Sequence, residues 1–177
     1  MREQLHRERL FDELPEPIVL DAARDYVARG WKPLPVKRGN KGCVEKGWPT
    51  LEVTTDNMRE YFNRWTPAVC VQLGRASGGL TDVDLDSVEA IALTTAFDHF
   101  LPPTAAVFGR SSKPRSHYIY TTTLADDNSL GATVQFRESQ AADAAMLVEL
   151  RAGAGDSAAV TLFPPSEKAA MVKLDRF

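Results

Sequence analysis

The alternating segment Leu80–Asp86 constrains the fold of this chain more than any other part of its sequence. Alternate side chains of a β-strand point to opposite faces, so the three non-acidic residues after Leu80 would face a core. The three acids would project together from the other face, about 6–7 Å apart at a rise of roughly 3.3 Å per residue. These acids are Asp82, Asp84 and Asp86.

Three like charges on one face repel one another unless a cation lies between them. Hard divalent ions such as Mg²⁺ prefer oxygen ligands of this kind, so the strand is a candidate metal site. An acidic edge strand that ends in a helix cap at Ser87 is the structural alternative. The alternation alone leaves both interpretations open.

The composition is that of one globular domain, with room for two lobes. The chain has 177 residues, of which 44% are hydrophobic, and this is enough to bury a core. The polar N-terminus is not a signal peptide, and no apolar run approaches the roughly 20 residues of a membrane span. We therefore expect no association with a membrane.

The cysteines and tryptophans are expected to be structural. Cys43 and Cys70 match neither a zinc knuckle nor a disulfide framework, so we expect no zinc and a reducing, cytoplasmic setting. Cys70 lies in an apolar run and is expected in the core. The tryptophans are expected to pack in the core or between lobes rather than to stack on bases: Trp31, Trp48 and Trp65.

The net charge of −3 argues against non-specific nucleic-acid binding by the molecule as a whole. The charges are unevenly distributed, however. Residues 32–46 contain five cations and one acid, and residues 110–117 contain three cations and no acid. A protein that holds metal ions in one pocket and phosphates in another has such a balance. Solvated loops are the alternative.

Hydrophobic spacing and turn residues predict an α+β domain that begins with a charged arm at residues 1–16. Helices are expected at residues 18–29, 54–65 and 87–101. Strands are expected at residues 31–36 (at a sheet edge, because of two prolines), 68–73, 79–86, 105–108, 116–120, 133–136, 146–150 and 158–163. Helices and strands alternate early and strands dominate late, which favours a mixed β-sheet with flanking helices.

The strands at 105–108 and 116–120 are expected to be joined by a basic loop, residues 109–115. Glycine and serine in this loop offer backbone N–H groups, and several cations surround them. Arginine binds phosphate oxygens as a fork and lysine adds a point charge. With His117 at the start of the next strand, the segment is a candidate polyphosphate site. An inert surface hairpin is the alternative.

A single acid, Glu149, interrupts the apolar strand at 146–150. A lone carboxylate in such a strand is unfavourable unless it is paired or bound to a metal. Arg151 lies two residues further on, on the same face of the strand. A salt bridge between the two residues would explain the acid without any metal.

These elements, in this order, resemble the catalytic domain of the archaeo-eukaryotic primase superfamily. The closest resemblance is to the bifunctional DNA primase/polymerase (prim-pol) N-terminal domain of phages, plasmids and bacterial mobile elements. Asp84-Leu85-Asp86 matches its Asp-x-Asp motif, His117 its Ser-x-His motif and Glu149 its later single acid. Further matching segments extend the resemblance from about residue 22 to residue 166: residues 30–35, 47–49, 73–80 and 164–166.

The resemblance implies a primase fold, with an RRM-like catalytic core at about residues 79–170 and a smaller N-terminal α/β lobe at about residues 17–78. It implies template-directed nucleotidyl transfer by a DNA primase or DNA polymerase. The implied partners are template and primer DNA, nucleoside triphosphates and a replicative helicase in cis or in trans.

The resemblance also assigns roles to individual residues. Two Mg²⁺ or Mn²⁺ ions are expected on Asp84, Asp86 and Glu149, where they would activate the primer 3′-hydroxyl and neutralise the triphosphate. Residues in and near the basic segment are expected to bind the nucleotide: His117, Arg115, Lys113, Ser116, Arg110 and Arg151. Residues of an earlier basic loop are expected to follow DNA phosphates: Lys37, Arg38, Lys41 and Lys46.

The chain departs from the family pattern in two places. Arg115 stands where the motif has serine, two residues before His117, so Arg115 is expected to contact phosphate directly. Asp82 forms a second in-phase Asp-x-Asp pair with Asp84 and is the alternative metal ligand. Three other functions stay open: a metal-dependent nuclease, a catalytically silent nucleic-acid-binding replication domain, and a sugar transferase.

Overall fold

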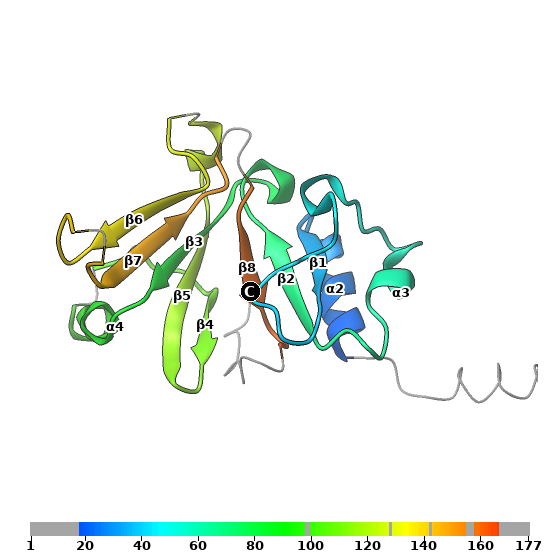
Figure 1. Ribbon diagram of the computed structural model, residues 1–177, viewed down its shortest axis with the longest axis horizontal. Coiled ribbons are helices and arrows are strands. Elements are labelled where there is room, and N and C mark those ends of the chain that lie inside the picture. Colours follow the sequence, from blue (N-terminus) through cyan, green and yellow to red (C-terminus); the bar gives the residue numbers. More distant parts are fainter. Residues whose placement is uncertain (1–17, 98–99, 128, 142, 155–157, 167–177) are drawn as a thin grey trace, which may run out of the picture.

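The fold consists of two β-sheets with helices packed against them (Figure 1). The computed structural model describes residues 18–97, 100–127, 129–141, 143–154 and 158–166, so the predicted arm at 1–16 lies outside the described residues. The predicted α+β class is confirmed. The sheets are not mixed, however, because every pair of neighbouring strands in the described part of the chain is antiparallel.

The smaller sheet has three strands in the order β1-β2-β8. Its strands are β1 (Lys32–Val36), β2 (Ala68–Gln72) and β8 (Val160–Phe163). The proline-containing β1 lies at an edge, as predicted. Helix α2 (Ile18–Ala28) packs against this sheet and contacts the one-turn helix α3 (Met58–Tyr61) (Figure 1).

The larger sheet has five strands in the order β4-β5-β3-β7-β6. Its strands are β3 (Leu80–Leu85), β4 (Val107–Arg110), β5 (Lys113–Thr121), β6 (Thr133–Arg137) and β7 (Met146–Arg151). The acidic strand β3 therefore lies in the centre of the sheet. This position excludes the edge-strand alternative, because β5 and β7 pair with β3 on its two sides.

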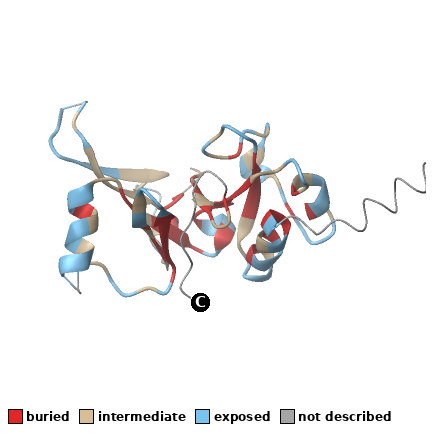
Figure 2. Ribbon diagram, turned by 90° about the horizontal axis from the view of Figure 1, so that it is seen from below, coloured by how far each residue is buried: buried red, intermediate tan, exposed pale blue. Residues whose placement is uncertain are grey.

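The main core lies where the two sheets meet. The rings of Phe108 in β4 and Phe163 in β8 lie 4.9 Å apart, and Leu80 at the start of β3 is buried in the same cluster. Figure 2 shows the buried segments in the middle of the molecule and mostly exposed residues on the peripheral helix α4 and in loops. The inner face of the larger sheet is thus turned toward the smaller sheet.

Helix α4 (Val88–Ala96) covers the outer face of the larger sheet. Its Ala90 is buried with Leu85 and Tyr118 of the sheet. The Ser87 side chain accepts a hydrogen bond of 2.9 Å from the Ala90 amide, so the predicted cap is confirmed. The helix ends earlier than residue 101, because Phe97 has an extended backbone.

The helix predicted at 54–65 is much shorter in the structure. Asn57 accepts a hydrogen bond from the Thr54 amide and donates one to the Glu52 carbonyl, which holds residues 54–57 as a turn. Asparagine commonly forms such local bonds in competition with a helix. The helix begins at Met58, and a non-helical backbone at Phe62 ends it after one turn.

Strand β8 belongs to the smaller sheet, although it lies near the end of the described chain. It pairs with β2, from Val69 opposite Phe163 to Gln72 opposite Val160. The sequence predicted a boundary near residue 78 between the N-terminal lobe and the catalytic core, and β8 was expected on the core side of it. The pairing of β8 with β2 was not anticipated. The smaller sheet combines two N-terminal strands with one C-terminal strand, and the division into lobes stays a prediction.

Candidate metal and nucleotide site

Three adjacent strands bring the principal site residues to one face of the larger sheet. Asp84 of β3 lies directly opposite His117 of β5 on one side and Glu149 of β7 on the other. Residues directly opposite each other in a sheet share a face. Sequence positions far apart therefore meet on the face turned toward the smaller sheet.

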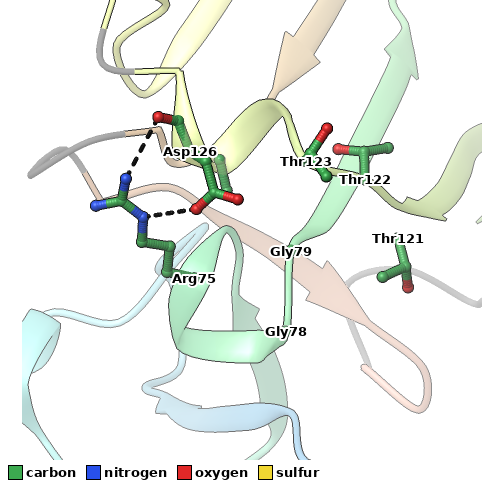
Figure 3. Close-up of a pocket in the computed structure, with 8 residues that line it drawn as sticks. Arg75, Gly78, Gly79, Thr121, Thr122, Thr123 and Asp126 are labelled. Atoms are coloured by element: carbon green, nitrogen blue, oxygen red, sulfur yellow. Dashed lines mark hydrogen bonds and ion pairs between the residues drawn. The ribbon is translucent and has the colours of Figure 1, made fainter.

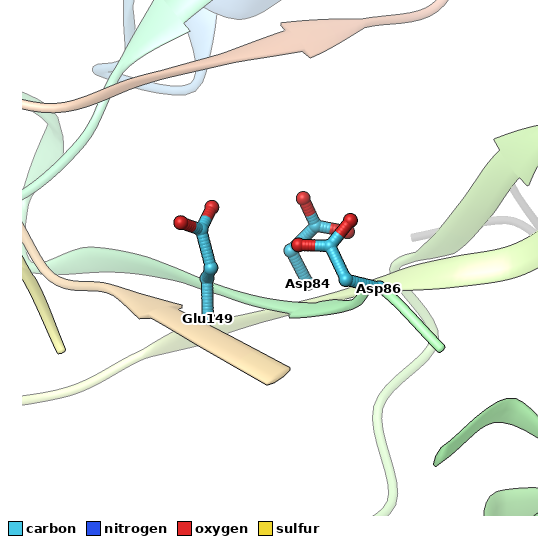
Figure 4. Close-up of side chains that lie close together, drawn as sticks. All are labelled: Asp84, Asp86 and Glu149. Carbon is cyan, nitrogen blue, oxygen red and sulfur yellow. The ribbon is translucent and has the colours of Figure 1, made fainter. Parts of the chain in front are cut away.

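Three carboxylates form a compact cluster in this region (Figure 4). Asp84, Asp86 and Glu149 each offer one oxygen atom, and these atoms all lie within 4.8 Å of one another. Asp84 is buried, while Asp86 and Glu149 are partly exposed. Oxygen ligands at this spacing, on a partly open face, are suited to hard divalent ions such as Mg²⁺ and Mn²⁺.

Arg151 lies inside the carboxylate cluster rather than beside it. One guanidinium nitrogen, Nη2, lies 2.5 Å from Asp84 Oδ2 and 2.6 Å from Glu149 Oε2. The other terminal nitrogen, Nη1, lies 3.7 Å from Asp82 Oδ2. The salt bridge expected between Glu149 and Arg151 is therefore present, and it coexists with the metal-type cluster. This position makes Arg151 a counter-ion of the carboxylates, whereas the sequence assigned it to the nucleotide.

Asp82 is engaged with different partners. Its side chain is completely buried, and Oδ2 lies 3.0 Å from His117 Nδ1. The same oxygen accepts a 2.7 Å hydrogen bond from the hydroxyl of Thr161, which comes from β8 of the smaller sheet. The His117 ring also stacks on Phe108, with 5.0 Å between ring centroids. Asp82 is not part of the carboxylate group that could hold an ion.

Burial and neighbouring charges shift the pKa values in this cluster. Burial raises the pKa of Asp84 to about 6, although His117 and Arg151 act in the opposite direction. For His117, burial works to lower the pKa, but the carboxylates of Asp82 and Asp84 outweigh it and the pKa is raised. For Glu149, burial is outweighed by Arg151 and by a hydrogen bond from Gln135, so the pKa is lowered.

The basic segment has a tighter turn than predicted. Strand β4 continues to Arg110 and β5 begins at Lys113, and these two residues are paired in register. The turn is thus Ser111-Ser112 rather than residues 109–115. The Lys113 ammonium bonds the backbone carbonyl of Asp86 and lies 3.4 Å from its carboxylate. Lys113 therefore reaches the carboxylate cluster.

The other basic residues of the segment differ from Lys113 in their surroundings. Arg115 has a left-handed backbone with φ of 59°, within an irregular stretch of the β4–β5 pairing. Its guanidinium lies 6.0 Å from the ring centroid of Tyr118, which packs on the α4 side of the sheet. The structure therefore does not bring Arg115 to His117. Ser116 is buried and Arg110 is exposed.

The earlier basic loop is a separate exposed surface. Its four cations are Lys37, Arg38, Lys41 and Lys46, all exposed. Lys37 pairs with Glu45 at 2.8 Å. The structure does not test the predicted contact of this loop with DNA phosphates, so the contact stays a prediction.

The tryptophans differ in their environments. Trp31 packs against Phe163 with 5.6 Å between ring centroids, and Trp48 packs against the core beside β1. Trp65 is 76% exposed, so the expectation that it packs internally is wrong. The early end of α3 explains this, because Trp65 falls in the turn that follows the helix.

Two contributors to the site were missed at the sequence level. Thr161 lies on a strand of the other sheet, so no spacing within the acidic strand points to it. Gln135 of β6 donates a 2.8 Å hydrogen bond to Glu149 Oε1. Its place opposite Glu149 follows from the pairing of β6 with β7, and this pairing was not predicted from the sequence.

A surface pocket of about 620 Å³ lies at the other end of β3, where the strand begins (Figure 3). Arg75 and Asp126 in its wall form an exposed ion pair of 3.0 Å. Gly79 in the wall has a positive φ of 84°, and an added Cβ would lie 2.2 Å from the Thr122 carbonyl oxygen. Only glycine permits this close passage of the two backbones.

Comparison with known proteins identifies the family. The family model for the N-terminal domain of bifunctional DNA primases/polymerases, Prim-Pol, matches residues 23–172. The chain belongs to the Prim-Pol family. No curated protein matches the chain. Within the described residues of this Prim-Pol domain, no helix has the length and apolar character needed to cross a membrane.

Family membership also defines the general activity. Prim-Pol domains are DNA primase/polymerase nucleotidyltransferases, so DNA and nucleotides are the general substrate classes. The family is typically dependent on divalent metals, and the cluster of Asp84, Asp86 and Glu149 has the donor chemistry for such ions. The resemblance recognised from the sequence is thereby confirmed.

Proposed function

We propose that this Prim-Pol domain extends or initiates DNA chains by a two-metal mechanism, with Asp84, Asp86 and Glu149 as the ligands. The observation that supports this most strongly is the convergence of their three oxygen atoms within 4.8 Å. Such ions, when bound, lower the pKa of the attacking 3′-hydroxyl and neutralise the triphosphate and the leaving pyrophosphate.

Arg151 prepares the ligands before any ion arrives. Its guanidinium is bonded to Asp84 Oδ2 and Glu149 Oε2, so it fixes the orientation of both carboxylates and reduces their mutual repulsion. Asp84 Oδ1 and the partly exposed Asp86 carboxylate are directed to other neighbours. The carboxylates are thus oriented before a cation binds, and a cation would compete with Arg151 for these two oxygens.

Lys113 and His117 are the candidates for binding the nucleotide phosphates. Lys113 reaches the carboxylate cluster from one side, and His117 lies 3.6 Å from Asp84 on the neighbouring strand. Two cationic or hydrogen-bonding groups beside the metal ligands hold a triphosphate in line with the attacking oxygen, so most of the catalysis is positioning. Base pairing with the template then selects the nucleotide, and the exposed cations at residues 37–46 follow the DNA backbone.

The test is primer extension by the purified chain. A labelled primer on a template is incubated with Mn²⁺ or Mg²⁺, with and without nucleoside triphosphates. We expect extension that needs all components, with dNTPs and NTPs compared in parallel and a second reaction without primer to detect initiation. Cleavage of the primer without nucleotides would favour a nuclease. DNA binding that is indifferent to metal and to Glu149→Gln would favour a catalytically silent domain.

Partners beyond DNA and nucleotides belong to the same proposal. A replicative helicase, in cis or in trans, and an origin in a phage or mobile element stay predictions of the family resemblance. A pull-down with helicases encoded beside the gene, followed by primer extension in their presence, tests the first. Stimulation of extension by such a helicase is the expected result.

A further inference from the structure

Asp82 is a buried carboxylate that the two-metal mechanism does not use. Its side chain is completely buried at the centre of the larger sheet, between β5 and β7. A buried carboxylate is strongly unfavourable unless hydrogen bonds and opposite charges compensate it. Its partners therefore indicate what it does in the folded protein.

The hydrogen bonds of Asp82 converge on one imidazole. His117 Nδ1 lies 3.0 Å from Asp82 Oδ2 and 3.3 Å from Oδ1. Thr161 donates a 2.7 Å hydrogen bond to Oδ2, and so fixes the carboxylate from the other sheet. Arg151 Nη1 lies 3.7 Å from the same oxygen and supplies opposite charge. The Asp82 carboxylate is thus held from two sides while it faces the histidine.

The His117 ring is constrained on its face as well as at its edge. Phe108 stacks on the ring at 5.0 Å between centroids and with 26° between planes. Carboxylate oxygens accept hydrogen bonds, so we assign the proton of this contact to His117 Nδ1. This fixes the tautomer and leaves Nε2 as the nitrogen that is free of Asp82.

We propose that Asp82, held by Thr161, is a positioning residue: it keeps a proton on His117 Nδ1, fixes the orientation of the ring, and so presents Nε2 to a phosphate of the bound nucleotide. The nucleotide part of this inference rests on the proposed function. A phosphate oxygen only accepts hydrogen bonds, so Nε2 makes this contact as a donor, in the ring that carries a proton on both nitrogens while Nδ1–H stays bonded to Asp82. The role differs from the one that the sequence offered for Asp82, that of an alternative metal ligand.

The tautomer is measured by ¹⁵N–¹H correlation spectra of the imidazole rings in the whole chain. A His117→Gln variant identifies the His117 signals among those of the three histidines. We expect the wild type and Thr161→Ser to show Nδ1 protonated. Asp82→Ala should show mixed or Nε2-protonated His117. A wild-type ring with its neutral proton on Nε2 would overturn the proposal, whether or not the protein is a polymerase.

Measurements of nucleotide kinetics and of metal binding distinguish a positioning role of Asp82 from a role as metal ligand. We expect Asp82→Ala to raise the KM for the nucleotide about tenfold or more, with a smaller effect on kcat. Its Mn²⁺ affinity, measured by calorimetry, should fall less than that of Asp84→Asn, because Asp82 offers no oxygen to the group that could hold an ion. A Mn²⁺ affinity that falls by orders of magnitude together with an unchanged tautomer would make Asp82 a metal ligand instead.

A second pair of variants covers a failure of Asp82→Ala to fold. Thr161→Val removes the hydroxyl but keeps the shape of the side chain, and Thr161→Ser keeps the hydroxyl. We expect Thr161→Val to raise the KM a few-fold and Thr161→Ser to match wild type. Equal KM values and identical His117 spectra in the two variants would refute the role of Thr161. A wild type without primer extension but with Nδ1–H at His117 would defeat only the proposed function.

Discussion

Asp84 and Glu149 lie directly opposite each other on β3 and β7 and share the guanidinium group of Arg151. The pairing of strands distant in sequence thus creates a carboxylate pair with its own internal counter-ion. A cation that enters the cluster meets ligands that are already oriented, and it competes with Arg151 for two of their oxygens.

Asp84→Asn and Glu149→Gln should each reduce primer extension by about 10²–10³-fold, because an amide replaces an anionic metal ligand. The fold should persist, since the substitutions keep the shape of the side chains. Rates of primer extension check the loss of activity, and circular dichroism checks that the fold persists. Asp126→Asn is the control, because it removes an exposed carboxylate outside the cluster. Wild-type rates in either cluster variant would refute the metal assignment.

Arg151→Met should destabilise the metal-free protein by about 3 kcal/mol, because it removes the guanidinium group that Asp82, Asp84 and Glu149 share. Urea unfolding of wild type and variant, in the presence of a metal chelator, measures the change in the free energy of unfolding. Millimolar Mn²⁺ should restore more stability to this variant than to wild type, since the ion replaces the missing charge.

Arg75→Met is the matched control for this experiment. Arg75 also pairs with a carboxylate, but both side chains of that pair are more than half exposed. We expect a loss of less than about 1 kcal/mol and no dependence on Mn²⁺. Equal losses of unfolding free energy in the two variants would show that the ion pairs of Arg151 stabilise the protein no more than an ordinary surface ion pair does.

The raised pKa of Asp84, about 6 against its ordinary 3.8, predicts a pH dependence of metal-free stability. Between these values the folded state binds more protons than the unfolded state, so the free energy of unfolding falls as the pH rises. The raised pKa of His117 adds a loss in the same direction, as the pH rises through its folded value. Denaturant unfolding from pH 4 to pH 8 measures the slope, and Asp84→Asn should flatten its lower part.

The affinity for Mn²⁺ should depend on the same Asp84 carboxyl group, but it should rise with pH, whereas the free energy of unfolding falls. Below about pH 6, Asp84 holds a proton that an ion must displace, so Mn²⁺ affinity should fall as the pH is lowered. Calorimetry in buffers of different ionisation enthalpy would also show proton release on binding. An affinity that is independent of pH from 5 to 7.5 would contradict this prediction.

Lys113→Gln should raise the KM for the nucleotide about tenfold, because Lys113 is the cation of the basic segment that reaches the carboxylate cluster. Arg115→Gln should change the KM less than about twofold, since its guanidinium lies against Tyr118. Initial rates over a range of dNTP concentrations compare them. A larger effect at Arg115 would mean that its side chain turns to the phosphates when nucleotide binds.

Gly79→Ala should destabilise the protein by about 3 kcal/mol or more, because φ is positive and the new Cβ would overlap the Thr122 carbonyl oxygen. Gly78→Ala is the matched control. It has a similar φ of 66° but no atom within 4 Å of the added Cβ, so only about 1–2 kcal/mol should be lost. Similar unfolding free energies for both variants would contradict the close approach seen at Gly79.

The sequence predicted the site best where local alternation decides the outcome. The period-two pattern of β3 put Asp84 on the same face as Asp82, and the ordered motifs brought His117 and Glu149 into the site. The pattern did not distinguish the roles of the aspartates, because a shared face does not reveal which partner each side chain meets. That difference depends on Thr161, a residue of the other sheet.

The errors in the fold have local physical causes. The bonds of Asn57 replaced the first turn of the helix predicted at 54–65. An irregular pairing of β4 with β5 turned Arg115 away from the site, and such an irregularity has no clear sequence signal here. Antiparallel pairing throughout follows from long-range contacts, which the order of elements along the chain did not determine.

The return of β8 to the smaller sheet has a consequence for folding. Strand β2 has β1 on one side and β8 on the other, and Val69 pairs with Phe163 from the far end of the chain. During synthesis the five strands of the larger sheet emerge before β8 does. The smaller sheet therefore cannot be complete until β8 pairs with β2, and Thr161 cannot reach Asp82 before β8 is in place, so the environment of His117 is complete only once both sheets have formed.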